Sequence, residues 1–165
     1  MLRRVGISIF AALLAAGAVG AAPAANAAEA NTAKTGLRFE NPAGMAPPVG
    51  PYSHVAIVPP GSELLVVAGQ IGADPAGALP TDPAQQYRNA LSNVIAALKA
   101  QGLGPEHIIK LNIWLVGDVP VEMTRAIRAE LFGTAKPPST LAYINRLGRS
   151  DLLVEIEAWA ARPPT

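Results

Sequence analysis

Two carboxylates on one strand are the side chains of this sequence best suited to chemistry. Glu155 and Glu157 lie in the stretch LLVEIEAWA, residues 152–160. A positioned carboxylate can exchange a proton with a reacting group or with a water molecule. Because successive side chains of a strand point to opposite faces, both share a face with Trp159, whereas the other face is apolar. A face of this composition could be solvated, an interface between subunits, or the wall of a site.

The segment GPYSH, residues 50–54, holds three further reactive side chains. Ser53 and His54 are adjacent, so on an extended backbone they point apart, and no third group is identifiable that would orient the histidine. We therefore do not expect a serine nucleophile. Tyr52 follows a glycine and a proline at the entrance of a predicted strand, where its phenol could line a cleft.

Residues that usually hold metals and cofactors are sparse. The sequence has no cysteine, and its two histidines, His54 and His107, are far apart with no metal-ligand spacing around them. The glycines of GQIG, residues 69–72, lack the lysine and the helix start of a phosphate-binding loop. They instead suit a tight turn or a close approach of the backbone to a ligand. We expect neither a metal nor a cofactor.

The N-terminal residues have the three parts of a secretory signal peptide. Arg3 and Arg4 precede an apolar run over residues 5–19, and Ala25-Asn26-Ala27 gives a pattern of small residues for cleavage. We expect a signal peptide over residues 1–27, cleaved after Ala27, and a periplasmic or secreted protein without stable membrane insertion. The rival interpretation is an uncleaved anchor, for which the run is short and rich in alanine.

Charge and composition describe the rest of the chain. Loss of two arginines with residues 1–27 changes the formal net charge from +1 to −1, and no basic cluster remains. Nucleic acid is therefore not expected as a partner. Residues 28–45 are rich in alanine, glycine and proline, which predicts a linker or a loosely laid N-terminal arm. Residues 46–163 are long enough to form one domain with its own core.

The periodicity of the apolar residues predicts seven elements in the order β-β-α-β-α-β-β. Strands are expected over 54–58 and 63–69 as a hairpin, then over 107–116, 139–145 and 151–161. The first helix begins after Asp82, with Pro83 at its first position. The second is capped by Asp118 and stops at Gly133, with a core stripe of Met123, Ala126, Ile127 and Leu131. This is an α+β domain with two helices on one face of a single sheet.

The sheet face away from the helices has an unusual composition. It carries Lys110, Asn112, Trp114, Glu155, Glu157 and Trp159. Its tryptophans favour burial, and polar groups buried beside them need hydrogen-bonding partners. We therefore expect self-association through this face, with pockets at the edge of the interface. Arg125 and Arg128, on the second helix, are expected to face solvent by default.

Four short motifs occur here in the order and spacing of one known family. They are PPVGPYSH, VVAGQIG, the proline pair at 137–138 and LLVEIEA. Together they make the chain resemble the Rid family, the YjgF, YER and UK proteins. The resemblance implies a chorismate-mutase-like fold and a homotrimer with small-molecule clefts between its subunits, and it places Glu155 in such a cleft.

The resemblance also implies an activity. Well-studied members hydrolyse reactive enamines and imines released by pyridoxal-phosphate enzymes, giving a keto acid and ammonia. By this resemblance Glu155 orients or activates water, while Tyr52 and the backbone amide of Gly69 complete the cleft. The family arginine that holds the substrate carboxylate lies 15 residues before the glutamate, where this chain has Thr140. Arg125 stands at the position of a cleft asparagine, and we hypothesise that it supplies a replacement charge.

Three functions therefore remain open. The first is a divergent imine or enamine hydrolase with Glu155 as the catalytic residue. The second is a trimer that binds a small ligand through Tyr52, Gly69, Arg125 and Thr140 without turnover, because loss of the arginine weakens carboxylate binding by about 10- to 150-fold. The third is a trimer that holds unfolded clients. Loss of turnover in Glu155→Gln would separate the first from the other two.

Overall fold

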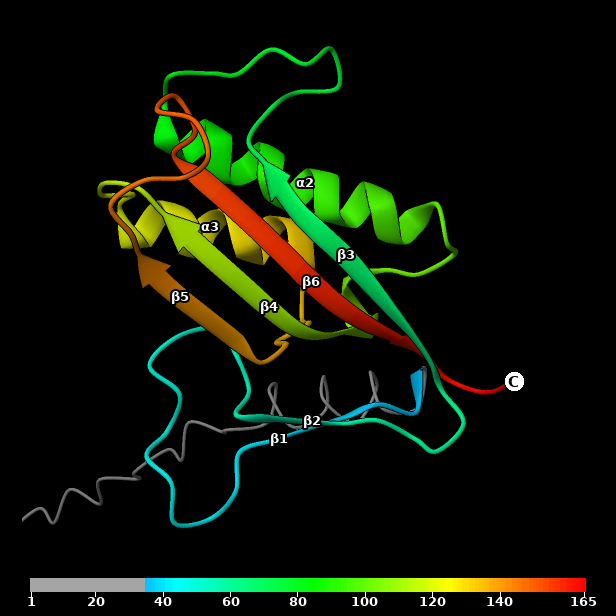
Figure 1. Cartoon of the computed structure of the whole chain (residues 1–165). Coiled ribbons are helices and arrows are strands. Elements are labelled where there is room, and N and C mark those ends of the chain that lie inside the picture. Colours follow the sequence, from blue (N-terminus) through cyan, green and yellow to red (C-terminus); the bar gives the residue numbers. More distant parts are fainter. Residues whose placement is uncertain (1–34) are drawn as a thin grey trace, which may run out of the picture.

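The computed structural model describes residues 35–165, so the predicted signal peptide lies outside the described residues (Figure 1). Nine short and long elements follow one another along the described chain. They are β1 (Arg38–Glu40), β2 (Val55–Ile57), β3 (Glu63–Ile71), α2 (Pro83–Lys99), η1 (Pro105–His107), β4 (Ile108–Leu115), α3 (Val121–Phe132), β5 (Ser139–Tyr143) and β6 (Val154–Arg162).

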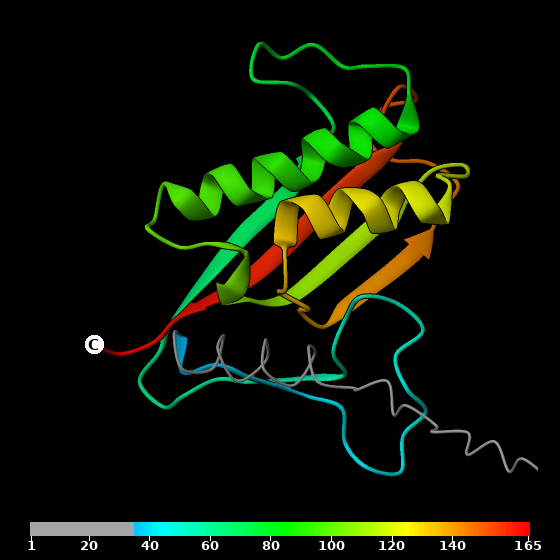
Figure 2. The same cartoon turned by 180° about the vertical axis from the view of Figure 1, so that it is seen from behind.

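Four of the strands form one mixed sheet in the order β3-β6-β4-β5. Strand β6 is antiparallel to both of its neighbours, and β4 pairs with β5 in parallel. Both long helices cover the same face of this sheet, as the view from behind shows (Figure 2). The predicted α+β architecture, with two helices on one sheet face, is therefore confirmed.

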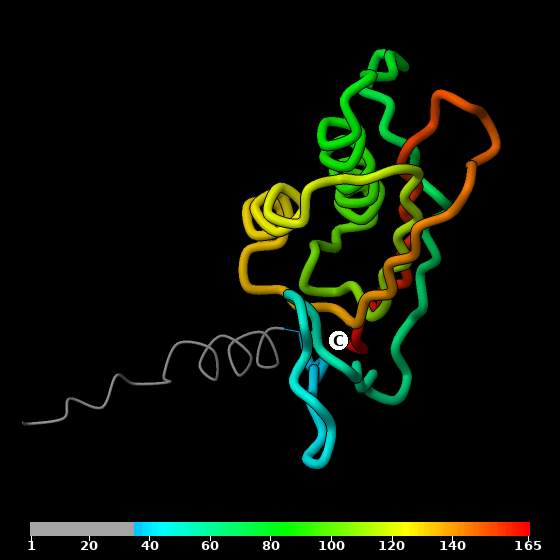
Figure 3. The backbone as a smooth tube through the Cα atoms, turned by 90° about the vertical axis from the view of Figure 1, so that its left-hand side faces the viewer, coloured from blue at the N-terminus to red at the C-terminus, as the bar shows by residue number. Residues whose placement is uncertain are grey.

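The predicted hairpin of the first two strands is wrong. Strand β2 pairs with β1, which falls in the segment predicted to be a linker or arm, and β3 pairs with β6. The β1–β2 ladder is a separate sheet at one end of the four-stranded one (Figure 3). The cause is Pro59 and Pro60, which follow β2: without N–H groups they cannot continue a ladder into the turn.

The two long helices begin differently. The Asp82 side chain accepts hydrogen bonds from the backbone N–H groups of Ala84 (3.2 Å) and Gln85 (3.3 Å), so the predicted cap of α2 is confirmed. The predicted cap of α3 by Asp118 is wrong, because this helix begins at Val121 after Pro120 with no side-chain cap. The helical conformation is disfavoured for Val119, the residue before Pro120, so the helix does not extend back to Asp118.

The face of α3 that packs on the protein is also displaced from the predicted stripe. The buried residues are Thr124, Ile127, Arg128 and Phe132, whereas Met123 is 44% exposed. The expectation that Arg128 faces solvent is wrong, since only 8% of it is exposed. Two polar residues can occupy this face because the Thr124 hydroxyl donates to the Val121 carbonyl and the Arg128 guanidinium lies over the Phe132 ring.

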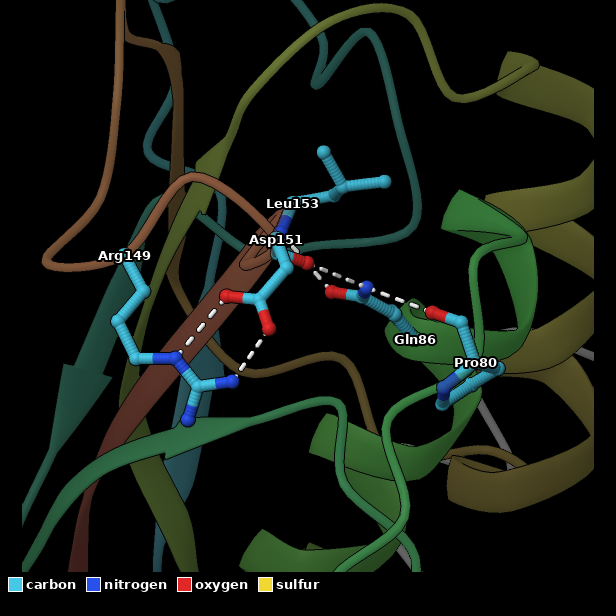
Figure 4. Close-up of polar contacts among 5 residues, drawn as sticks. All are labelled: Pro80, Gln86, Arg149, Asp151 and Leu153. Atoms are coloured by element: carbon cyan, nitrogen blue, oxygen red, sulfur yellow. Dashed lines mark hydrogen bonds and ion pairs between the residues drawn. The ribbon is translucent and has the colours of Figure 1, made fainter.

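A buried glutamine joins the start of α2 to the loop before β6 (Figure 4). The Gln86 side-chain amide donates to the carbonyls of Pro80 (2.8 Å) and Asp151 (3.0 Å), and its oxygen accepts from the Leu153 N–H (2.9 Å). Gln86 is fully buried. These three bonds give the buried amide of Gln86 its partners and satisfy one backbone group in each of Pro80, Asp151 and Leu153.

Replacing Gln86 by leucine is expected to lower the free energy of unfolding by about 2–4 kcal/mol, because three backbone groups lose a buried partner. Urea denaturation followed by far-ultraviolet circular dichroism measures this change. Gln85→Leu is the matched control, since Gln85 is exposed and its side-chain amide donates only to Asn89 of the same helix. A change of similar size in both variants would refute a special role for Gln86.

Candidate functional site

The chain carries a β-bulge in β3 directly beside the predicted catalytic carboxylate. Between Val67 and Gln70 the strand holds one residue more than β6 does over the same interval, so Ala68 and Gly69 bulge. A Cβ atom built on Gly69 would overlap Oε1 of Glu155 and lie 2.8 Å from its Cδ. The carboxylate of Glu155 therefore packs directly on the bulged glycine. Bulges of this kind re-aim side chains and backbone groups at functional sites.

A row of polar contacts crosses the same sheet face. The Asn112 amide donates to Oε1 of Glu157 at 2.6 Å, and Nζ of Lys110 donates to Oγ1 of Thr140 at 2.5 Å. Thr140 is the position at which the resemblance implies an arginine. The register of β4 and β5 thus places an ammonium group beside that position, although the guanidinium is missing.

A pocket of about 410 Å³ lies on the opposite side of the sheet, between the edge strand β5, helix α3 and the loop before β2. Tyr52 and Arg125 line it, together with apolar side chains of β4 and β5. Arg125 is exposed: its Nη1 atom donates to Oε1 of Glu122 at 3.1 Å and its Nη2 atom donates to the Val49 carbonyl at 3.4 Å. The Tyr52 ring contacts the His54 ring edge-on.

The five predicted site residues therefore fall into two groups within one chain. Gly69, Thr140 and Glu155 lie on the sheet face away from the helices, whereas Tyr52 and Arg125 line the pocket on the helix side. Side-chain alternation separates the two faces along every strand. A site that uses all five residues needs a second copy of the chain.

Two other features of the described residues bear on the chemistry. Nε2 of His54 lies 2.9 Å from the carbonyl of Ala46, and no hydrogen bond within residues 35–165 joins it to Ser53. Within the same range, His, Cys, Asp and Glu side chains form no group of three suited to a metal ion. No helix in this part of the chain has the length and apolar character needed to cross a bilayer.

Comparison with known proteins decides the family. A family model described as Endoribonuclease L-PSP matches residues 43–162. The chain belongs to this family. The predicted resemblance to the Rid proteins is confirmed with it, because a solved member of the Rid family from Yersinia pestis superposes with a TM-score of 0.65. The two chains are 28% identical over 75% of this chain and 97% of the other.

Two Rid relatives are similar in sequence over nearly their whole length. A RutC family protein of Pyrococcus horikoshii is 34% identical over 115 residues, covering 68% of this chain and 88% of its own. The 2-iminobutanoate/2-iminopropanoate deaminase of Escherichia coli K12 is 34% identical over 119 residues, covering 69% of this chain and 89% of its own.

Three residues that lie at these two sites were not predicted from the sequence as site residues. Lys110 was assigned to the correct sheet face, but its contact with Thr140 depends on the pairing of two strands 30 residues apart. Arg128 and Tyr87 also line the pocket. Arg128 was expected to face solvent, and Tyr87 was not named as a site residue. The buried face of α3 depends on where this helix lies relative to β5, which the residue pattern of the helix alone does not determine.

Proposed function

We propose that this Rid-family chain is an exported trimer that hydrolyses a small imine or enamine, with Glu155 positioning the attacking water. The observation that carries the proposal is the contact of the Glu155 carboxylate with the bulged Gly69. A carboxylate and a backbone amide at one bulge can serve together, the first by accepting a proton and the second by donating a hydrogen bond. The name of the Escherichia coli relative supports this reaction class.

The proposed reaction is balanced by one water molecule. Water attacks the imine carbon while the Glu155 carboxylate accepts a proton from it. The proton then passes to the nitrogen, which gives a carbinolamine. Glu155 next takes the proton of the carbinolamine hydroxyl and delivers it to the amine as the carbon–nitrogen bond breaks, so ammonia leaves and a carbonyl product forms. Glu155 returns to its ionised form at the end of the cycle, so no further reactant is required.

We propose further that the substrate carries a carboxylate and that Lys110 binds it. Lysine supplies a compact charge on a flexible stem, in contrast to the planar fork of arginine. Because its ammonium already contacts Thr140, Lys110 can replace the missing guanidinium on this face. Arg125 lies on the other side of the sheet within the chain, so Lys110 is the stronger candidate for this role.

The trimer proposal is supported by apolar side chains that the single chain leaves uncovered. Val66 is 61% exposed and Trp159 is 42% exposed, and the two pair across β3 and β6 on the face of Glu155. An apolar area of this kind favours burial between subunits. A second copy packed there would also exclude water from Glu155, which strengthens its electrostatic interactions.

The proposal of export is supported by the N-terminal sequence. The signal-peptide pattern over residues 1–27 supports a periplasmic or secreted trimer. Its formal charge of −1 after cleavage does not favour ribonucleic acid as a substrate, despite the description of the family.

The alternative function is a trimer that binds a small ligand without turnover. The presence of Thr140 in place of the family arginine favours this alternative.

The test is an imine-hydrolysis assay on the chain that begins at residue 28. An amino acid oxidase generates the imine in the presence of semicarbazide, and the trapped semicarbazone is followed by absorbance. Hydrolysis of the imine is expected to lower the yield of semicarbazone. The Escherichia coli deaminase, assayed in parallel as the active control, should lower it as well. Light scattering on the same preparation is expected to give three chain masses. An unchanged semicarbazone yield with an active control would reject the hydrolase and favour the binding trimer.

A further inference from the structure

The bulge that brings Gly69 against Glu155 lies close to the end of its strand. Before the bulge, β3 pairs with β6 at five successive residues. After the bulge it pairs at only two, Gln70 and Ile71. A bulge interrupts the ladder locally, so a segment with two remaining pairs holds the extra residue weakly. The position of this end of β3 therefore depends on contacts outside the ladder.

One of these contacts comes from the middle of helix α2. The Asn93 side-chain amide donates to the carbonyls of Ile71 at 3.1 Å and Ala73 at 2.9 Å. Ile71 is the residue of β3 that pairs with Glu155 of β6. Asn93 thus bonds the strand end at the position directly opposite the proposed catalytic carboxylate.

The strand end also lies directly on the backbone of α2. A Cβ atom built on Gly72 would lie 2.4 Å from the Cα atom of Gln86, and the Asn89 side-chain amide donates to the Gly72 carbonyl at 2.9 Å. Gln86 in turn accepts from the N–H of Leu153, two residues before Glu155 (Figure 4). Amide side chains along one helix therefore bond both strands of the proposed site.

A second contact lies within β3 itself. Nε2 of Gln70 donates to the carbonyl of Ala68 at 3.0 Å and lies 3.4 Å from the carbonyl of Gly69. Residues paired across two antiparallel strands project to the same face, and Gln70 pairs with Ile156, which belongs to the core beneath the helices. Gln70 therefore bonds the two bulged residues from the face away from Glu155.

The bond to Ala68 affects the direction of the Gly69 amide. The Ala68 carbonyl and the Gly69 N–H belong to one planar trans peptide group, in which they point in opposite directions. Because Gln70 holds this carbonyl, the Gly69 N–H is kept pointing away from the Gln70 side chain. Loss of the Gln70 donors would free this peptide group to rotate.

We propose that Gln70 and Asn93 are positioning residues for imine hydrolysis, an inference that rests on the function proposed above for Glu155. Gln70 orients the amide of Gly69, and Asn93 fixes the strand end that pairs with Glu155. Both act from the helix side of the sheet, so they affect the reaction through the backbone of β3. Their loss should lower kcat rather than raise KM, because Lys110, which is proposed to bind the substrate, belongs to β4.

Gln70→Met and Asn93→Asp test the proposal in the chain from residue 28. Methionine has no donor, and aspartate has the shape of asparagine without its two donors. Each variant is expected to lower kcat by about 10- to 100-fold with KM nearly unchanged, since a misplacement of about 1 Å can cost about 100-fold. The semicarbazide competition assay separates the two constants when the amount of oxidase, and hence the imine concentration, is varied. Asn93→Gln keeps both donors and should retain part of the rate.

Asp82→Ala is the matched control for a loss of stability. It removes two hydrogen bonds from the start of α2 and none from β3. It should lower the melting temperature by about 2–8 °C, as loss of a helix cap does, and leave kcat unchanged. An equal fall of kcat in Asp82→Ala and Asn93→Asp would mean that the stability of α2 determines the rate, and would overturn the proposal for Asn93.

Hydrogen–deuterium exchange tests the same residues without relying on activity. Peptides over residues 67–73 are expected to exchange about 10-fold faster or more in Gln70→Met and Asn93→Asp, and at an unchanged rate in Asp82→Ala. If the unmodified protein hydrolyses no imine, the proposed function fails, and the exchange rates alone decide whether the two residues hold the bulge. Unchanged exchange in both variants, or unchanged kcat in the variants of an active protein, would overturn the proposal. Gln70 is not buried, so Gln70→Met decides the case in which Asn93→Asp does not fold.

Discussion

Glu155→Gln is expected to reduce the rate of imine hydrolysis by about 10²- to 10⁴-fold, the usual contribution of a general base. Glutamine preserves the size of the side chain and its packing on Gly69, but it cannot accept a proton from the attacking water. Thermal stability and the mass of the assembly should therefore remain those of the unmodified protein. The semicarbazide competition assay, run over a range of protein concentrations, measures the loss directly.

Glu157→Gln is the matched control for this prediction. Glu157 lies two residues further along β6 on the same face, and its Oε1 atom accepts from the Asn112 amide at 2.6 Å. A glutamine oxygen can accept the same hydrogen bond, so activity should change little. Equal losses in the two variants would mean that the charge of the face matters rather than a proton acceptor at Glu155. Full activity in Glu155→Gln would exclude Glu155 as the base.

The sequence correctly predicted those helices and strands whose ends depend on residues that are close in the sequence. The cap of α2 is such a case, since Asp82, Pro83 and the apolar stripe of the helix are all within one segment. The pairing of β1 with β2 could not be predicted in this way. Two three-residue strands 15 residues apart carry almost no periodicity, and the ladder depends on where Pro59 forces the chain to turn.

The candidate site shows the same division. Alternation along β6 predicted that Glu155 leaves the core, and the structure agrees. The contact of Glu155 with Gly69 depends instead on a bulge in β3, which shifts the register by one residue.

The exposure of Arg128 was predicted wrongly for a different reason. Single-sequence statistics favour solvent for an arginine, and only the position of α3 over the edge of the sheet turns this side chain into a pocket.

Lys110→Met is expected to lower kcat/KM for imines that carry a carboxylate by about 10-fold or more, because a charged hydrogen bond to the substrate is lost. Imines without a carboxylate, generated by an amine oxidase, should be hydrolysed at an unchanged rate. Thr140→Arg in the Lys110→Met background returns a cation to the family position and should restore the loss. A decrease for both classes of imine, or no rescue by arginine, would mean that Lys110 stabilises the sheet face and does not bind the substrate.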